Sequence, residues 1–384
     1  EPMTPDAPAP TRRPRILYNP AERNDRVAEV VEADGETLTT ALLSAEQGLT
    51  AWSLQSPEQR TRVLDRTADL MEAASFELLA LLIREAGKTL SSAVRELREA
   101  VDLLRYDAER LRGRDHRVQV APLGIVACLS PWNAPLSVFT GQVASALAAG
   151  NAVIAKPAEQ TPMIAARATQ LLHDAGVPPE ALHMLPGDAA LGTALVEDMR
   201  VDAVMFTGAT AAAKDLSRRL FGRVGRTGLP VQLITQTSAQ NAMLVDSSAL
   251  PEQAIRDIIS SAFDSSGQNC AALRILLVQE DCADAFLERL RGAMRELSIG
   301  NPARLLTDIG PVISSEAQAE IEDHIDRMRR AGRPIWSLEP GETCRHGHFV
   351  APTLIEIGRV EISATKFLVR SCISAAMPAA NSTG

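Results

Sequence analysis

The sequence has few cysteines and few aromatic residues, and it has no long uninterrupted apolar segment. Only 3% of its 384 residues are aromatic, and no two cysteines form a CxxC pair. An odd, widely spaced set of cysteines excludes a disulfide framework and is typical of a reducing compartment, so we expect a cytoplasmic protein. Residues 118–155 carry no formal charge, but Pro131, Asn133, Pro135 and Gln142 interrupt them, and no membrane-spanning helix is expected there. The cysteines are Cys128, Cys270, Cys282, Cys344 and Cys372.

The chain also lacks a basic excess. It has 39 basic and 48 acidic residues, a net charge of −9, which disfavours nucleic acid or an anionic membrane surface as a main partner. Only four of the basic residues are lysines, Lys88, Lys156, Lys214 and Lys366, so an anion-binding role for any one of them is easy to test. His346 and His348 follow Cys344 closely, but no fourth ligand is evident, and no metal site is predicted.

The length suggests two or three domains. We expect residues 1–15, which are rich in proline, to form a linker, and the start of the chain reads as the inside of a longer chain or as a cut fragment. Ser56-Pro57-Glu58-Gln59 predicts the start of a helix that ends near Gly87, and a second helix is predicted over 89–112.

From Leu123 onwards, short apolar runs alternate with helical segments. Strands are predicted at 124–129, 152–155 and 203–206, and helices near 136–149, 161–175 and 210–221. This alternation predicts an α/β fold with a parallel sheet and helices on both faces. Such sheets bind ligands at the carboxyl ends of their strands, so the residues that follow each apolar run are the first candidates for chemistry.

The glycine fingerprint GxGxxG of dinucleotide-binding proteins is absent. Gly222, Gly225 and Gly228 have a different spacing and no strand precedes them, so they are interpreted as a loop. This motif therefore predicts no nucleotide site.

Four segments that follow predicted strands or turns carry a resemblance. They are Ser130-Pro131-Trp132-Asn133, Ala155-Lys156-Pro157-Ala158-Glu159, Phe206-Thr207-Gly208 and Ser266-Gly267-Gln268-Asn269-Cys270. In this order and spacing the sequence resembles the aldehyde dehydrogenase superfamily. Further segments are similar to the L-glutamate γ-semialdehyde (Δ1-pyrroline-5-carboxylate) dehydrogenase module of bifunctional proline utilization A proteins, among them Val138-Phe139-Thr140-Gly141-Gln142, Gln240-Asn241-Ala242 and Asp308-Ile309-Gly310-Pro311.

The resemblance implies an aldehyde dehydrogenase-like fold with a Rossmann-like parallel sheet as cofactor domain and a partial α/β catalytic domain. It divides the chain into the linker 1–15, an NAD-binding domain at 16–268, a partial catalytic domain at 269–360 and a divergent tail at 361–384. A shortened oligomerisation flap is expected near 107–123. Because the family's last strands and tail have no counterpart here, homo-oligomer formation is doubtful, and an open apolar sheet edge is expected.

Two residues would carry the first chemical step. A thiolate at Cys270 could attack an aldehyde, although a lone cysteine is more often buried and inert. The amide of Asn133 could donate to the oxyanion that develops, or the residue could simply form an Asx turn beside proline. The resemblance favours the nucleophile and the oxyanion donor.

The implied cofactor is NAD. By resemblance, Lys156 and Glu159 would hold the hydroxyls of the adenine ribose, whereas without it they would be a solvated pair at a strand end. Trp132 would flank the cofactor phosphates or belong to the core. Gly208 would let a helix N-terminus approach the pyrophosphate. Ala209 stands where the family has a serine that binds a phosphate.

The most consequential departure is Gln236. The family's Glu-Thr-Gly-Gly segment is here Gln236-Thr237-Ser238-Ala239, which puts an amide at the position of the general base. An amide holds water but cannot accept its proton, and the loss of a general base costs about 10²–10⁴ in rate.

The resemblance therefore implies NAD-dependent oxidation of L-glutamate γ-semialdehyde to L-glutamate in proline catabolism, through a thiohemiacetal and a thioester on Cys270. Two alternatives stay open. One is a catalytically impaired structural or interaction domain of a larger polypeptide, and the other is an aldehyde dehydrogenase for another substrate. Expected partners are a small aldehyde and an upstream proline dehydrogenase domain.

Overall fold

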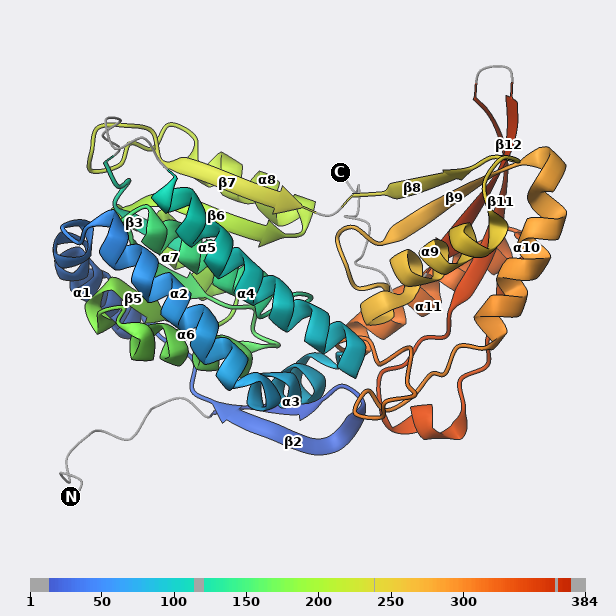
Figure 1. Ribbon diagram of the computed structural model, residues 1–384, viewed down its shortest axis with the longest axis horizontal. Coiled ribbons are helices and arrows are strands. Elements are labelled where there is room, and N and C mark those ends of the chain that lie inside the picture. The colour runs from blue at the N-terminus through green and yellow to red at the C-terminus, as the bar shows by residue number, and fades with distance from the viewer. Residues whose placement is uncertain (1–13, 114–120, 238, 363–364, 374–384) are drawn as a thin grey trace.

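The computed structural model describes residues 14–113, 121–237, 239–362 and 365–373. It contains two five-stranded sheets and one two-stranded hairpin. Each five-stranded sheet, with the helices packed on it, forms one lobe, and the two lobes lie side by side (Figure 1). In the described part of the chain, no helix is both long and apolar enough to cross a membrane.

The first lobe contains a parallel sheet in the order β5-β4-β3-β6-β7. Its central strands are buried on both faces, which is typical of a parallel sheet covered by helices. The strands are β3 (Ile125–Leu129), β4 (Ala152–Lys156), β5 (Leu182–Met184), β6 (Val201–Gly208) and β7 (Gln232–Thr237). The predicted α/β fold with a parallel sheet is confirmed.

The side chains of β3 point alternately into two hydrophobic cores, one on each face of the sheet. Val126 and Cys128 belong to one core and Ile125 and Ala127 to the other, because successive side chains of a strand point to opposite faces. The first core contains residues of α2 (Pro57–Ala73), α3 (Ser75–Ala86), α4 (Leu90–Arg112), α5 (Ser137–Ala148) and α6 (Pro162–Ala175). The second contains residues of α1 (Gly35–Ser53), α7 (Ala189–Glu197) and α8 (Thr210–Leu220).

Local signals set the helix ends. Ser56 and Gln59 form the predicted capping box at the start of α2. The region expected to be one helix from Ser56 to Gly87 is two helices, because α2 ends at Ala73 and α3 begins at Ser75. Gly87 ends α3 with φ 67°, a left-handed conformation that favours glycine. The helix predicted over 89–112 is α4, with Thr89 as its N-cap.

The second lobe contains a mixed sheet in the order β10-β11-β12-β9-β8. Here β8 and β9 are parallel, and the other neighbours are antiparallel. The strands are β8 (Asn241–Val245), β9 (Leu273–Gln279), β10 (Ile335–Ser337), β11 (Thr353–Ile362) and β12 (Thr365–Ile373). Its helices are α9 (Pro251–Phe263), α10 (Glu280–Arg295) and α11 (Ser315–Arg330), with short 3₁₀ helices at η2 (Asp264–Gly267) and η3 (Glu342–His346). A further 3₁₀ helix, η1 (Pro179–Ala181), precedes β5 in the first lobe.

A hairpin of β1 (Arg15–Asn19) and β2 (Glu22–Val30) contacts both lobes. In the first lobe, Arg84 of α3 forms an ion pair with Asp25 at 2.5 Å. In the second, the amide of His348 donates to the carbonyl oxygen of Pro20 at 2.9 Å. Figure 1 shows the hairpin beneath α3, reaching towards the second lobe.

The sheets divide the chain differently from the boundary expected at residue 268. Strand β8 and helix α9 precede that residue, yet both belong to the second lobe, so the two sheets separate between Thr237 and Asn241. The expected divergent tail also contributes structure, because β12 pairs with both β11 and β9 in the interior of the second sheet. Most of the predicted linker, and residues 114–120 of the predicted flap, lie outside the described residues.

Candidate functional site

The carboxyl ends of four strands of the first sheet meet at one edge. Leu129 of β3 pairs with Lys156 of β4 and with Phe206 of β6. Thr207 of β6 pairs in turn with Gln236 of β7. The segments that begin at Ser130, Lys156, Gly208 and Gln236 therefore leave the sheet side by side. This is the edge at which open parallel sheets bind their ligands.

Gln142 of α5 ties two of these strand ends together. Its amide nitrogen donates to the hydroxyl of Thr207 at 3.1 Å and lies 3.4 Å from the carbonyl oxygen of Leu129. The side chain is buried, so leaving this amide nitrogen without an acceptor would be costly. This contact gives a structural role to the glutamine of the Val138-to-Gln142 segment.

The loop that carries Trp132 and Asn133 follows β3, and both side chains are half-buried. The ammonium of Lys88 donates to the backbone carbonyl oxygen of Asn133 at 2.6 Å. The same ammonium forms an ion pair with Glu96 at 3.0 Å. The backbone of Asn133 is thus fixed by a buried charge on the loop that follows α3.

Cys270 belongs to the second lobe, at the end of a tightly held turn. Its side chain is half-buried, and the thiol lies 3.6 Å from the side-chain oxygen of Asn269. Gln268 is buried, and its amide nitrogen lies within hydrogen-bonding distance of the carbonyl oxygens of Ser265 and Pro311, while its side-chain oxygen accepts from the amide of Ile313 at 2.8 Å. These contacts fix the backbone directly before the thiol.

Lys156 stands at the end of β4 in a partly buried position. Its ammonium donates to the carbonyl oxygen of Pro157 at 3.2 Å, and burial lowers the pKa of this amine, partly offset by the nearby carboxylates of Glu159 and Asp188. The aliphatic stem passes over Gly192 of α7, where an added Cβ would lie 3.3 Å from the Cδ of Lys156. Glu159 is exposed. A cation and a carboxylate at a strand end can bond ribose hydroxyls.

Gly208 ends β6 directly before α8. A Cβ at this position would lie 2.6 Å from the ring of Phe206, so a side chain here would force that ring to move. The next residue, Ala209, is the N-cap of α8 and supplies no side-chain hydrogen bond. The first backbone amides of α8 therefore lack the side-chain cap that helix starts commonly have, and such amides bind phosphate groups well.

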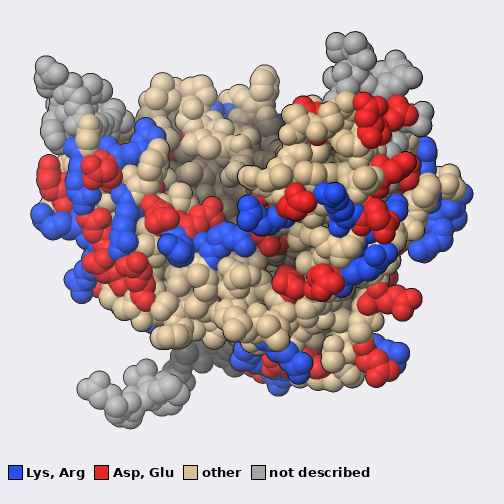
Figure 2. All heavy atoms as spheres, turned by 45° about the vertical axis from the view of Figure 1, so that its right-hand side comes forward, with Lys and Arg blue, Asp and Glu red and all other residues tan. Residues whose placement is uncertain are grey.

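Gln236 lies near the end of the edge strand β7 and is exposed. Among the described residues, no hydrogen bond joins Cys270 to either Asn133 or Gln236. One of the contacts between the lobes is made by Lys88, which contacts Asn133 of the first lobe and donates to the hydroxyl of Ser265, five residues before Cys270, at 3.2 Å. Figure 2 shows a hollow between the lobes with mostly uncharged walls and charged side chains along its lower border.

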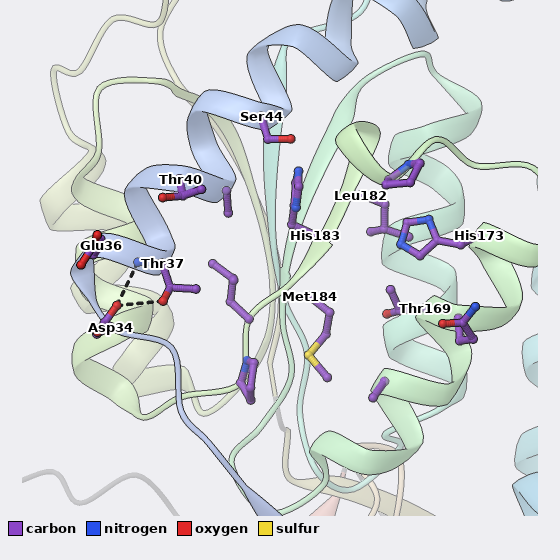
Figure 3. A pocket seen from close by; sticks show the side chains of 16 residues that line it. Asp34, Glu36, Thr37, Thr40, Ser44, Thr169, His173, Leu182, His183 and Met184 are labelled. Carbon is purple, nitrogen blue, oxygen red and sulfur yellow. Dashed lines mark hydrogen bonds between the residues drawn. The ribbon is translucent and has the colours of Figure 1, made fainter. Parts of the chain in front are cut away.

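A separate hollow of about 850 Å³ lies beside β5, the edge strand farthest from β7 in the first sheet, between α1 and α6 (Figure 3). None of the predicted site residues lines it. Asp34 at its border accepts from both the amide and the hydroxyl of Thr37, and so caps α1. The described residues contain no group of histidine, cysteine, aspartate and glutamate side chains that could hold a metal ion.

Comparison with known proteins identifies the family to which this chain belongs. The sequence profile of the Aldehyde dehydrogenase family matches residues 9–361 of this chain. The chain belongs to this family. The resemblance noted in the sequence is therefore confirmed at the level of the family and its fold.

Two individual relatives are similar to this chain over most of its length. The chain is 51% identical over 347 residues to the "Bifunctional protein PutA" of Escherichia coli (strain K12), with 89% of this chain and 26% of that protein covered. It is 32% identical over 357 residues to the "1-pyrroline-5-carboxylate dehydrogenase" of Geobacillus kaustophilus (strain HTA426), with coverages of 88% and 68%. The chain thus spans about a quarter of the length of its bifunctional relatives.

Solved structures agree with this fold. The 1-pyrroline-5-carboxylate dehydrogenase from Thermus with bound NAD matches with a TM-score of 0.82 at 29% identity, covering 89% of this chain and 69% of that one. A Bradyrhizobium japonicum proline utilization A variant matches with a TM-score of 0.80 at 41% identity, covering 85% and 34%. Both comparisons support an aldehyde dehydrogenase-like fold for the described residues.

Sequence reasoning missed several residues that organise this site. Lys88, Glu96 and Ser265 were not singled out for it. The one available signal was the rarity of lysine, which marks Lys88 as one of four. Nothing in the sequence indicates that its ammonium joins two segments more than 100 positions apart.

Proposed function

We propose that this chain oxidises L-glutamate γ-semialdehyde to L-glutamate with NAD as the hydride acceptor, as a step of proline catabolism. The proposal is supported by the family, by relatives named PutA and 1-pyrroline-5-carboxylate dehydrogenase, and by the residues at the shared sheet edge. The observation that carries it is the Lys88 contact between the Asn133 loop and the turn that leads to Cys270. A cytoplasmic location remains part of this proposal.

The described residues fit a dinucleotide. Lys156 supplies a partly buried cation, Gly208 leaves no Cβ at the end of β6, and α8 begins without a side-chain cap. Lys156 and Glu159 would hold the adenine ribose, Trp132 would lie beside the phosphates, and Gly208 and Ala209 would present the start of α8 to the pyrophosphate. When bound, NAD supplies the acceptor for the hydride that leaves the aldehyde carbon.

In the proposed first half-reaction, the thiolate of Cys270 forms a bond to the aldehyde carbon, and the carbonyl electrons move to oxygen. The amide of Asn133 donates to that oxyanion, a contribution of about 10²–10³ in rate. Loss of hydride restores the carbonyl and leaves a thioester on Cys270. Hydrolysis of the thioester breaks the carbon–sulfur bond and releases the acid.

The second half-reaction needs a base for water, and Gln236 stands at that position. Its amide can orient water but cannot take a proton near neutral pH. We therefore infer that acylation of Cys270 is faster than hydrolysis. The same observation favours the second candidate, a catalytically impaired domain of a larger polypeptide that includes a proline dehydrogenase.

Rapid mixing with L-glutamate γ-semialdehyde and NAD tests the proposal. We expect about one equivalent of NADH, followed by a much slower phase, and a mass increase on Cys270 from the acyl group. A straight-chain aldehyde without charged groups is the control for substrate specificity, and Cys270→Ser is the control for the nucleophile. No NADH, together with no NAD binding by calorimetry, would leave only the impaired domain.

A further inference from the structure

Three polar contacts converge on the buried ammonium of Lys88. The residue is 7% exposed, and its nitrogen lies 3.0 Å from Glu96, 2.6 Å from the carbonyl oxygen of Asn133 and 3.2 Å from the hydroxyl of Ser265. The ammonium thus donates two hydrogen bonds, to Asn133 and Ser265, and its charge is balanced by the carboxylate of Glu96. Its position therefore depends on groups from both lobes at once.

Glu96 extends this arrangement to the other end of the Asn133 loop. Its second carboxylate oxygen accepts from the amide of Leu136 at 2.8 Å and lies 3.4 Å from the amide of Ser137, where α5 begins. Glu96 is 4% exposed, so its charge has little water to stabilise it. The Lys88–Glu96 pair thus fixes segment 133–137 at both ends.

On the second lobe, the same ammonium meets an unusual turn. Ser265 and Ser266 have φ values of 52° and 57°, in the left-handed region that residues other than glycine rarely adopt. Such a conformation persists only where the surroundings enforce it. The hydroxyl of Ser265 accepts from Lys88, and that of Ser266 donates to the carbonyl oxygen of Gly310 at 2.8 Å.

We propose that Lys88, held by Glu96, is the positioning residue that sets the Asn133 loop against the turn leading to Cys270. Lys88 contacts a backbone oxygen and a serine hydroxyl, so it acts through the placement of Asn133 and Cys270 and not on the substrate. Without its charge, neither the loop nor the left-handed turn keeps its shared anchor. This inference rests on the proposed function and adds a residue to it.

The test uses the double variant Lys88→Met/Glu96→Gln, which removes both charges and so leaves no unpaired buried ion. Lys214→Met, on the exposed side of α8, is the matched control. Hydrogen exchange is read at the amides of Leu136 and Ser137, which face Glu96, and at the amide of Gln268, which donates to the carbonyl oxygen of Ser265 at 3.1 Å. The rate of the NADH burst is measured in parallel.

We expect exchange to rise about tenfold at these amides in both segments together, with other helices unchanged. The burst should slow by about 10²-fold, as for a small misplacement of reacting groups. Lys88→Arg, which keeps the charge, should recover part of the rate, and Lys214→Met should behave as the wild type. If the double variant does not fold, Glu96→Gln alone should show a smaller rise in both segments.

Unchanged exchange in either segment, in a folded variant, overturns the positioning role whatever the activity. Increased exchange in both segments with an unchanged burst rate overturns it as well. Absence of a burst in the wild type overturns the proposed function instead, and the exchange of the two segments still decides whether Lys88 anchors them.

Discussion

The side-chain amide of Asn241 holds the backbone on both sides of Ala271, the residue that follows Cys270. Its amide nitrogen donates to the carbonyl oxygen of Cys270 at 2.8 Å and to that of Ala272 at 3.1 Å. Asn241 begins β8 and pairs with Leu273 at the start of β9. The Gln240-Asn241-Ala242 segment thus has a physical task, which is to fix the residues that follow the candidate nucleophile.

Replacing this asparagine should disturb that turn. Asn241→Ala leaves two carbonyl oxygens without their donor, and we expect a loss of about 1–3 kcal/mol in the free energy of unfolding. Alkylation of Cys270 should change in rate while that of Cys282 does not. Urea unfolding and peptide mass spectrometry check both outcomes, with Gln232→Ala on exposed β7 as control. Equal labelling rates and equal stability would remove this role from Asn241.

Gln236→Glu should convert a single turnover into continuous turnover. A carboxylate on this exposed strand end can accept the proton of the attacking water, and a general base contributes about 10²–10⁴ in rate. Steady-state NADH production should rise by that order, and the burst should become smaller as hydrolysis approaches the rate of acylation. Gln232→Glu, on the same strand, is the matched control. A slow phase that does not accelerate would show that the base is not the missing element.

The pH dependence of the free energy of unfolding should reveal the titration of Glu85. Burial raises the pKa of this carboxyl from 4.5 to about 7, although it accepts from the amides of Met163 and Ile164 at 2.7 and 2.9 Å at the start of α6. Between these two values the folded chain binds more protons than the unfolded chain. The free energy of unfolding should therefore fall as pH rises from 4.5 to about 7, by about 3 kcal/mol in total.

Glu85→Gln removes the titration and should flatten this part of the curve. Glu77→Gln, an exposed neighbour on α3, should keep the slope of the wild type. Urea unfolding measured at several pH values from 4.5 to 7 gives both curves. A Glu85→Gln curve that still falls like that of the wild type would assign the slope to another group.

Gly124 should tolerate no side chain. It has φ +135°, and an added Cβ would lie 1.9 Å from a carboxylate oxygen of Asp202. That carboxylate is buried, accepts from the amide of Ile125 and pairs with Arg226 at 2.8 Å, so it cannot move away without losing these contacts. We expect Gly124→Ala to destabilise the protein by more than about 3 kcal/mol.

Gly292 provides the matched control. It lies in α10, and nothing approaches within 4 Å of its added Cβ. Gly292→Ala should stabilise the chain by about 0.5–1 kcal/mol, because alanine favours a helix over glycine. In thermal melts we expect Tm to fall for Gly124→Ala and to rise for Gly292→Ala. A Gly124→Ala variant that melts like the wild type would contradict this expectation.

Thiol labelling should rank the cysteines. Cys128 is fully buried in β3, and burial strongly raises the pKa of its thiol. Burial also raises the pKa of Cys344, whereas Cys270 is only half-buried at the edge of its turn. With iodoacetamide at neutral pH we expect Cys270 to react well before Cys128, since the reagent needs access and thiolate. Peptide mass spectrometry over time checks the order, and early labelling of Cys128 would contradict the packing of β3.

The described structure agrees with much of what the sequence predicted locally. The helix start at Ser56, the helix end at Gly87 and the alternation after Leu123 each depend on neighbouring residues, and each appears where the pattern places it. The residues after β3, β4 and β6 share one sheet edge for the same reason, because parallel strands bring their carboxyl ends together. The catalytic and cofactor roles of Cys270, Asn133 and the others remain predictions.

Contacts between residues far apart in the chain could not be predicted from the sequence. The boundary expected at residue 268 missed that β8 pairs with β9, because pairing between strands more than 25 positions apart leaves no periodic signal. The tail lacked a recognisable pattern, yet β12 lies between β11 and β9, where backbone hydrogen bonds and not side-chain identity define the strand.

The sequence alone determined the family, the parallel sheet and the substitution at Gln236. Motif spacing and the alternation of strands and helices are patterns among residues close together in the chain, so they can be recognised without the fold. Only the tertiary structure showed that Lys88 contacts both the Asn133 loop and the turn before Cys270. A buried ammonium needs hydrogen-bond acceptors and an opposite charge wherever the fold supplies them, and for Lys88 these come from Asn133, Ser265 and Glu96, which no local pattern connects.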